Sequence, residues 1–193
     1  MEIKKKSTIL FLGDCITGAD RDLNNPNDLG HGYVERINDA IKNYRIKVVN
    51  RGVDENRTIN LLEQYEESVL AVKPDVVTIY IGMNDVWHHY SKGIETTNEE
   101  FENNFRSLLE KIKTDFNVPI IIIEPFIIDI TPELTKMREE LWQKVDIIRR
   151  LAREYAQEYI ALDGSFASAC IKHQPTFYSI DGVHPTEEGH KFI

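Results

Sequence analysis

The sequence predicts an α/β protein in which helices cover both faces of one parallel sheet. Short runs rich in Val and Ile alternate with longer helical patterns along the whole chain, which is typical of repeated strand–helix–strand units. Several of these runs are continuously apolar, as expected of parallel strands that are buried on both faces. Right-handed connections then give a three-layer α/β/α sandwich around a five-stranded parallel sheet. With 193 residues, 41% of them hydrophobic, the chain is expected to form a single domain over residues 1–193.

Five segments have the composition of strands, at residues 8–12, 46–50, 76–82, 119–126 and 159–163. Apolar residues at helical spacing predict three helices between them, at residues 34–44, 101–112 and about 132–158. The alternation of the two patterns is therefore continuous from end to end.

The composition narrows the functional class. A net charge of −9 argues against a nucleic-acid-binding protein, which needs a clustered basic face. No apolar run approaches the roughly 20 residues that span a bilayer, and the N-terminus does not resemble a signal peptide. Cys15 and Cys170 give no disulfide framework, which suits a reducing compartment. We therefore expect a cytoplasmic protein that binds neither nucleic acid nor membranes.

Chemically capable residues follow the first three predicted strands. Cys15 comes after the first strand, Asp54-Glu55-Asn56 after the second and Gly82-Met83-Asn84-Asp85 after the third. Ligands bind outside the carboxyl ends of the strands in an open α/β sheet. We therefore expect these three loops to meet at one crevice.

Cys15 is the candidate nucleophile. A free cysteine is most often a small buried hydrophobe, but this one lies beyond the Gly13-Asp14 turn, after the strand has left the core. If a helix begins here, its N-terminal N–H groups lower the pKa of the thiol and offer an oxyanion donor. This position favours the catalytic interpretation.

Asp181 and His184 are the candidate acid and base. They lie three positions apart in a turn that Pro185 makes rigid, so the carboxylate can fix the tautomer that the base requires. The alternative is an exposed turn histidine. Asn84 either belongs to a turn or points its amide N–H at a developing oxyanion. Together with Cys15, these residues predict a hydrolase.

His88 and His89 do not predict a metal site. Adjacent histidines on a helix face different directions, and no cluster of carboxylates or thiolates accompanies them. No metal and no organic cofactor is expected.

These motifs resemble the SGNH-hydrolase (GDSL lipase/esterase) family, and in particular its intracellular branch that includes carbohydrate acetyl esterases. The segment Gly13-Asp14-Cys15-Ile16-Thr17 resembles the family's Gly-Asp-Ser-Ile-Thr block. Residues 29–34 are similar to a Leu-Gly-x-Gly-Tyr-Val segment of that branch. Residues 50–53, 81–87 and 181–185 resemble the second, third and last blocks of the family, in the same order.

The resemblance implies a flavodoxin-like fold and a carboxylic-ester hydrolase. It puts Cys15 in the position of the nucleophile, His184 in that of the base and Asp181 in that of the orienting acid. The N–H groups of Cys15 and Glu55 and the side chain of Asn84 would then be oxyanion donors. Short acyl groups, acetyl above all, on a small-molecule or carbohydrate alcohol are the implied substrates.

Three further residues are candidate substrate contacts: Asp14, Trp87 and Tyr33. The two aromatic side chains would line a sugar-sized pocket, with core packing as the alternative. A homo-oligomer remains open, since related esterases assemble in several ways.

The chain departs from the family pattern at two site positions. Cys15 replaces the family's serine, either as natural divergence or as a substitution, and the longer C–S bond displaces the reacting atom. Glu55 replaces the glycine of the family's Gly-x-Ser-Gly-Asn block, and a non-glycine residue with positive φ costs roughly 1–2 kcal/mol. The Glu55 carboxylate would also repel an oxyanion unless Arg51 or Arg57 neutralises it. The chain ends at Ile193 within a predicted last helix, so that helix is expected to be truncated or unusually short.

Two other functions compete with the esterase. A pseudo-hydrolase would keep the crevice and bind an ester or glycan without turnover, because Glu55 disables the oxyanion hole. A cysteine phosphatase would use the Cys-x5-Arg spacing from Cys15 to Arg21 to hold a phosphate group, but this leaves Asn84, Asp181 and His184 unused.

Overall fold

The computed structural model describes residues 3–193. Within this range the chain forms a five-stranded, fully parallel sheet with the strand order β2-β1-β3-β4-β5. This is the flavodoxin-like order, so the fold class predicted from the sequence is confirmed. The strands are β1 (Thr8–Gly13), β2 (Lys47–Gly52), β3 (Val76–Tyr80), β4 (Ile120–Ile123) and β5 (Glu158–Ile160).

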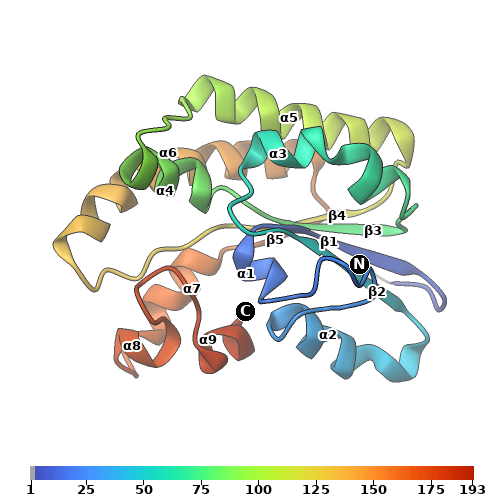
Figure 1. The fold of residues 1–193 in the computed structure, drawn as a ribbon, viewed down its shortest axis with the longest axis horizontal. Helices are drawn as coiled ribbons and strands as arrows, with labels where there is room; N and C mark the ends of the chain where they lie inside the picture. The colour runs from blue at the N-terminus through green and yellow to red at the C-terminus, as the bar shows by residue number, and fades with distance from the viewer. Residues whose placement is uncertain (1–2) are drawn as a thin grey trace.

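Helices cover both faces of the sheet and make the expected three layers (Figure 1). One layer holds α3 (Thr58–Glu63), α4 (Met83–Lys92), α5 (Asn98–Asp115) and α6 (Pro132–Tyr155). The other holds α1 (Cys15–Gly18), α2 (Tyr33–Ile41), α7 (Leu162–Ala169), α8 (Pro175–Tyr178) and α9 (Glu187–Phe192). Two short segments complete the chain: a 3-10 turn η1 (Lys42–Tyr44) and a π-helical turn η2 (Glu66–Leu70).

Successive residues of the central strands point to opposite faces of the sheet. Leu10 and Leu12 of β1 belong to the apolar cluster under α3 and α5. Ile9 and Phe11 belong to the cluster on the other face, which includes Tyr33 of α2. Because both faces are buried, the strands need continuous apolar sequences, which is the pattern that predicted them.

The strand ends differ from the prediction where the chain turns toward the next helix. β3 stops at Tyr80 because Gly82, with φ of 122°, turns the backbone into α4. β4 is confined to Ile120–Ile123, the four residues that pair with Val77–Tyr80 of β3, because β3 ends at Tyr80. The prediction of a strand up to residue 163 is wrong, because α7 begins at Leu162.

Helix α2 is shorter than predicted. It ends at Ile41, and Tyr44 lies in the η1 turn with its side chain exposed. The helices predicted over 101–112 and 132–158 correspond to α5 and α6, and α6 ends at Tyr155 so that β5 can begin. No helix within residues 3–193 combines the length and apolar character that crossing a bilayer requires.

Candidate active site

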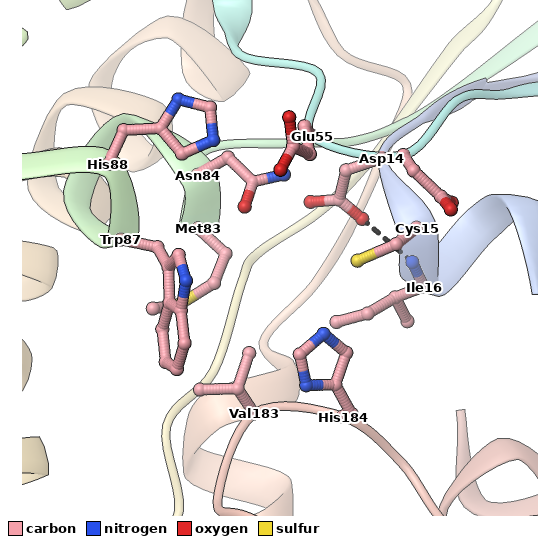
Figure 2. Close-up of a pocket in the computed structure, with 11 residues that line it drawn as sticks. Asp14, Cys15, Ile16, Glu55, Met83, Asn84, Trp87, His88, Val183 and His184 are labelled. Carbon is pink, nitrogen blue, oxygen red and sulfur yellow. Dashed lines mark hydrogen bonds between the residues drawn. The ribbon is translucent and has the colours of Figure 1, made fainter. Parts of the chain in front are cut away.

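A cavity of about 280 Å³ lies at the carboxyl ends of β1, β2 and β3. Six of the residues singled out in the sequence line it together: Asp14, Cys15, Glu55, Asn84, Trp87 and His184. They come from the start of α1, the loop after β2, the first turns of α4 and the turn before α9 (Figure 2). The expected convergence of the loops at one crevice is therefore observed.

The turn from β1 into α1 presents Cys15 to this cavity. A Cβ atom at Gly13 would lie 2.5 Å from the carbonyl oxygen of Tyr80, so only glycine fits at the end of the strand. Asp14 then caps α1, its Oδ1 accepting a hydrogen bond of 3.0 Å from the Ile16 N–H. Cys15 is the first residue of α1 and is half-buried, with its sulfur directed into the cavity (Figure 2).

The surroundings of Cys15 disfavour a thiolate. Burial raises the pKa of the thiol well above its usual range, and the nearby carboxylates of Asp14 and Asp54 raise it further. The N–H groups of Cys15 and Ile16 at the start of α1 lower this pKa, as predicted, but burial and the two carboxylates outweigh them. Helix α1 has only four residues, and the side chain of Asp14 accepts the N–H of Ile16.

Asp14 is a buried carboxyl group beside the thiol. Burial raises its pKa to about 7, against hydrogen bonding from Ile16 and the charge of His184, which lower it. Its second oxygen, Oδ2, has no hydrogen-bond partner among residues 3–193. Its proton therefore exchanges near neutral pH, next to the candidate nucleophile.

Asp181 and His184 form the hydrogen-bonded pair that their spacing predicted. Nδ1 of His184 lies 2.7 Å from Oδ2 of Asp181, and Oδ1 of Asp181 accepts the N–H groups of Val183 and His184. Burial raises the pKa of Asp181, but these hydrogen bonds outweigh it, and the net pKa lies below its usual range. Ser179 holds the turn by donating to the carbonyl oxygen of His184 at 2.8 Å.

With Nδ1 engaged by Asp181, the other nitrogen of His184 faces the cavity. Figure 2 shows this nitrogen on the same side as the sulfur of Cys15. Trp87 packs edge-on against the imidazole, with ring centroids 6.2 Å apart. The described residues show no hydrogen bond between Cys15 and His184. In enzymes without bound substrate, catalytic hydrogen bonds are often long and shorten only when substrate binds.

The three residues predicted to supply oxyanion donors all line this cavity. Cys15 is the first residue of α1, and Glu55 lies in the loop after β2. Asn84 donates one Nδ2 hydrogen to the Asn56 carbonyl oxygen at 3.1 Å, which leaves the second hydrogen free. Their role as donors to an oxyanion stays a prediction.

Glu55 has the left-handed backbone that the sequence predicted, with φ of 63°. Such a conformation costs a non-glycine residue about 1–3 kcal/mol. The cation that neutralises its carboxylate is Lys92, with Nζ 2.8 Å from Oε1, and this hydrogen bond lowers the pKa of Glu55. The predicted partners lie elsewhere: Arg51 donates to the Pro26 carbonyl oxygen and Arg57 to the Thr96 hydroxyl group.

Tyr33 and Arg21, two of the residues singled out in the sequence, do not line the cavity. Tyr33 is buried in the core, with its hydroxyl 2.9 Å from that of Thr17, so it packs rather than contacting substrate. Arg21 donates to the Gly52 carbonyl oxygen at 2.6 Å and lines a different cavity from Cys15. The Cys-x5-Arg spacing therefore forms no phosphate loop, which argues against a cysteine phosphatase.

Sequence reasoning gave no individual site role to five further lining residues: Ile16, Asp54, Met83, His88 and Val183. His88 lies one helical turn after Asn84, and that spacing could have found it. Burial lowers its pKa below the ordinary histidine value, which favours the neutral ring. His89 faces away and lies 2.9 Å from Glu140. Within residues 3–193 no group of His, Cys, Asp and Glu could hold a metal ion.

Residues 11–192 match the GDSL-like Lipase/Acylhydrolase family. The chain belongs to this family. Over 205 aligned residues, it is 31% identical to an acetylxylan esterase of Geobacillus stearothermophilus, with 100% of this chain and 93% of that protein covered. GDSL-like lipases and acylhydrolases are carboxylic-ester hydrolases, so the chain is an esterase by family.

Solved structures of GDSL-like proteins share the whole fold. A protein of Parabacteroides merdae described as a GDSL-like lipase has a TM-score of 0.93 at 31% identity, over 99% of this chain and 93% of that chain. A catalytic mutant of the Geobacillus stearothermophilus acetylxylan esterase has a TM-score of 0.90 at 30% identity, over 100% of this chain and 92% of that chain. The resemblance read from the sequence motifs is thus confirmed at the level of family and fold.

Proposed function

We propose that this GDSL-family protein hydrolyses short-acyl esters, acetyl esters above all, with Cys15 as the nucleophile. The observation that carries the proposal is the cavity shared by Cys15, Asn84, Glu55 and His184, with His184 oriented by Asp181 at 2.7 Å. Nucleophile, base, orienting acid and oxyanion donors are the parts that acyl transfer needs.

In the proposed cycle, His184 takes the proton from the Cys15 sulfur as the sulfur attacks the ester carbonyl carbon. The carbonyl oxygen becomes an oxyanion, held by the N–H groups of Cys15 and Glu55 and by Asn84. The intermediate expels the alcohol oxygen, which receives the proton from His184, and a thioester to Cys15 remains. Water, deprotonated by His184, then attacks the thioester and releases the acid and the free thiol.

The acetylxylan esterase supports these roles. Three of its structures are described as catalytic mutants, in which a serine, an aspartate or a histidine is replaced by alanine. The aspartate and the histidine are three positions apart, as Asp181 and His184 are here. We infer a small-molecule or carbohydrate ester as the substrate, with Asp14 and Trp87 as contacts in the cavity. The two free cysteines favour a reducing, cytoplasmic setting.

Turnover of p-nitrophenyl acetate tests the proposal. We expect the wild-type chain to exceed the His184→Ala variant and Cys15→Ser to be faster still. The C–S bond of cysteine is longer than the C–O bond of the family's serine and displaces the reacting atom, and a misplacement of about 1 Å costs on the order of 100-fold. Cys170→Ser is the matched control, because Cys170 is the other free thiol and lies outside the cavity.

A non-catalytic binding protein is the second candidate, favoured by the acidic surroundings of Cys15. Asp14, Asp54 and Glu55 all line the cavity and oppose negative charge there. If wild type and Cys15→Ser both stay at the His184→Ala rate, the oxyanion hole is not functional and this second candidate replaces the esterase.

A further inference from the structure

One ion pair bridges the rim of the cavity. Nζ of Lys92, in the last turn of α4, lies 2.8 Å from Oε1 of Glu55, in the loop after β2. Lys92 suits that position, because the C-terminal end of a helix favours a cation. The bridge joins two elements that each supply a proposed oxyanion donor: the Glu55 N–H and Asn84.

The loop is therefore fastened to α4 at both ends of the helix. At the first turn, Nδ2 of Asn84 donates to the Asn56 carbonyl oxygen at 3.1 Å. At the last turn, Lys92 forms its ion pair with the side chain of Glu55, the residue before Asn56. Together, the two contacts fix the Glu55 peptide N–H relative to the Asn84 amide.

Glu55 needs such a restraint for two physical reasons. Its φ of 63° is one that glycine adopts freely and glutamate does not, so the backbone tends to relax away from it. Its carboxylate also stands beside the place where an oxyanion forms, and a like charge there raises the energy of the transition state. Lys92 opposes both effects, because it anchors the side chain and neutralises its charge.

Resting on the esterase function above, we propose that Lys92 is a positioning residue for the oxyanion hole. Through its ion pair with Glu55, it keeps the Glu55 N–H aimed into the cavity and cancels the carboxylate. In this chain the Glu55–Lys92 pair maintains the left-handed backbone conformation that a glycine adopts without strain in the family pattern.

A double-mutant cycle on the full chain tests this role, with kcat and KM for p-nitrophenyl acetate as the readout. We expect Lys92→Met to lower kcat about fivefold, near the upper limit for an exposed ion pair, with little change in KM. Lys92→Arg should restore most of the rate, because it restores the charge. In a Glu55→Gly background, Lys92→Met should leave kcat unchanged, because neither the strained backbone nor the carboxylate remains.

Lys191→Met is the matched control. Lys191 forms an exposed ion pair with Glu188 at 2.7 Å on α9, away from the cavity, and its loss should not change kcat. Two results would overturn the inference. One is that Lys92→Met lowers kcat equally in the wild-type and Glu55→Gly backgrounds. The other is that Lys92→Met does not lower kcat in the wild-type background. Wild-type turnover at the level of the His184→Ala variant would instead overturn the proposed function, and the inference with it.

Discussion

At the scale of the residue, the environment of Cys15 explains how a cysteine can occupy a serine's position. Burial of the side chain, and after it the carboxylates of Asp14 and Asp54, raise the pKa of the thiol and favour its protonated form. In the proposed cycle, Cys15 therefore meets the substrate as a neutral thiol, and His184 removes its proton during the attack. A serine hydroxyl reacts in the same way. In this mechanism the cysteine thiol is deprotonated during the attack, as a serine hydroxyl is, and no thiolate–imidazolium pair forms beforehand.

Replacing Asp14 by asparagine tests this electrostatic argument. An asparagine side chain is isosteric with aspartate and can still accept the Ile16 N–H, so Asp14→Asn removes the charge and keeps the cap. Loss of the neighbouring carboxylate should lower the pKa of the Cys15 thiol. We expect severalfold faster alkylation of Cys15 by iodoacetamide at pH 8, measured by mass spectrometry of the labelled peptide.

Cys170 is the internal control for that experiment. Its pKa is raised by burial alone, so its alkylation rate should be the same in both proteins. If Cys15 reacts no faster in Asp14→Asn than in the wild type, Asp14 is not what holds the proton on the thiol.

Features of the site that depend on residues close together in the sequence could be predicted, and features that depend on contacts between distant segments could not. The Asp181–His184 pair follows from a three-residue spacing in one turn, and the left-handed Glu55 follows from a glycine-type position. The pKa of Cys15 depends on how deeply α1 is buried, and the pairing of Glu55 with Lys92 depends on how α4 packs beside the loop. Neither is encoded in a local pattern.

At the scale of the element, the helix that carries Asn84 is tied to its neighbour by a buried cap. Asp85 of α4 accepts both the N–H and the hydroxyl group of Thr58, the first residue of α3, at 3.0 and 2.8 Å. The carboxyl group is fully buried, so it depends on these two donors. The cap fixes the loop containing Glu55, which lies between β2 and α3, against α4.

Thr58→Val should destabilise the protein. Valine keeps the shape but removes one donor from a buried carboxyl group, a change that costs about 1–3 kcal/mol. We expect the urea midpoint of unfolding to fall without a change in the slope. Thr135→Val, at an exposed position of α6, is the control and should be nearly neutral. Equal midpoints for the two variants would show that the Asp85 cap contributes nothing to stability.

Element boundaries were harder to predict from the sequence than element types. The segment 159–163 is apolar enough for a strand, yet only Glu158–Ile160 pairs with β4 before α7 begins. Strand pairing ends where the partner strand ends, and that is a property of the sheet rather than of the segment. Tyr44 likewise keeps the helical spacing but lies beyond the end of α2.

At the scale of the whole molecule, the strand order decides which loops meet. Because β1 lies between β2 and β3, the segments that follow these three strands form one cavity wall, and the site could be predicted from parallel topology alone. The turn with Asp181 and His184 comes from far along the chain. Its Ser179–Pro185 bridge closes the turn, and the Ile128 N–H donates to the Gly182 carbonyl oxygen within it at 2.8 Å. The sequence predicted this turn at the cavity only through its chemistry, because a candidate nucleophile needs a base nearby.

The same convergence buries two carboxyl groups, and this should make the stability of the protein depend on pH. Burial raises the pKa of Asp14 to about 7 and that of Asp85 to about 6, both well above the value of about 4 expected in the unfolded chain. The folded state thus binds more protons than the unfolded state between about pH 4 and pH 7. Stability contributed by these groups is full at low pH and is lost as pH rises through that window.

Asp14→Asn should therefore gain stability over the wild type as pH rises. At about 1.4 kcal/mol per pKa unit, Asp14 alone gives a difference of about 3 kcal/mol between pH 5 and pH 8. We expect the Tm of Asp14→Asn minus that of the wild type to grow up to about pH 7, the folded-state pKa of Asp14, and to level off above it. His190, with a pKa lowered by burial to about 4, acts in the opposite sense but equally in both proteins, so it cancels from the difference. Asp146→Asn, at an exposed position of α6, is the control, and its Tm difference from the wild type should not change with pH. If the Tm difference of Asp14→Asn does not change with pH either, Asp14 is ionised in the folded protein throughout this pH range.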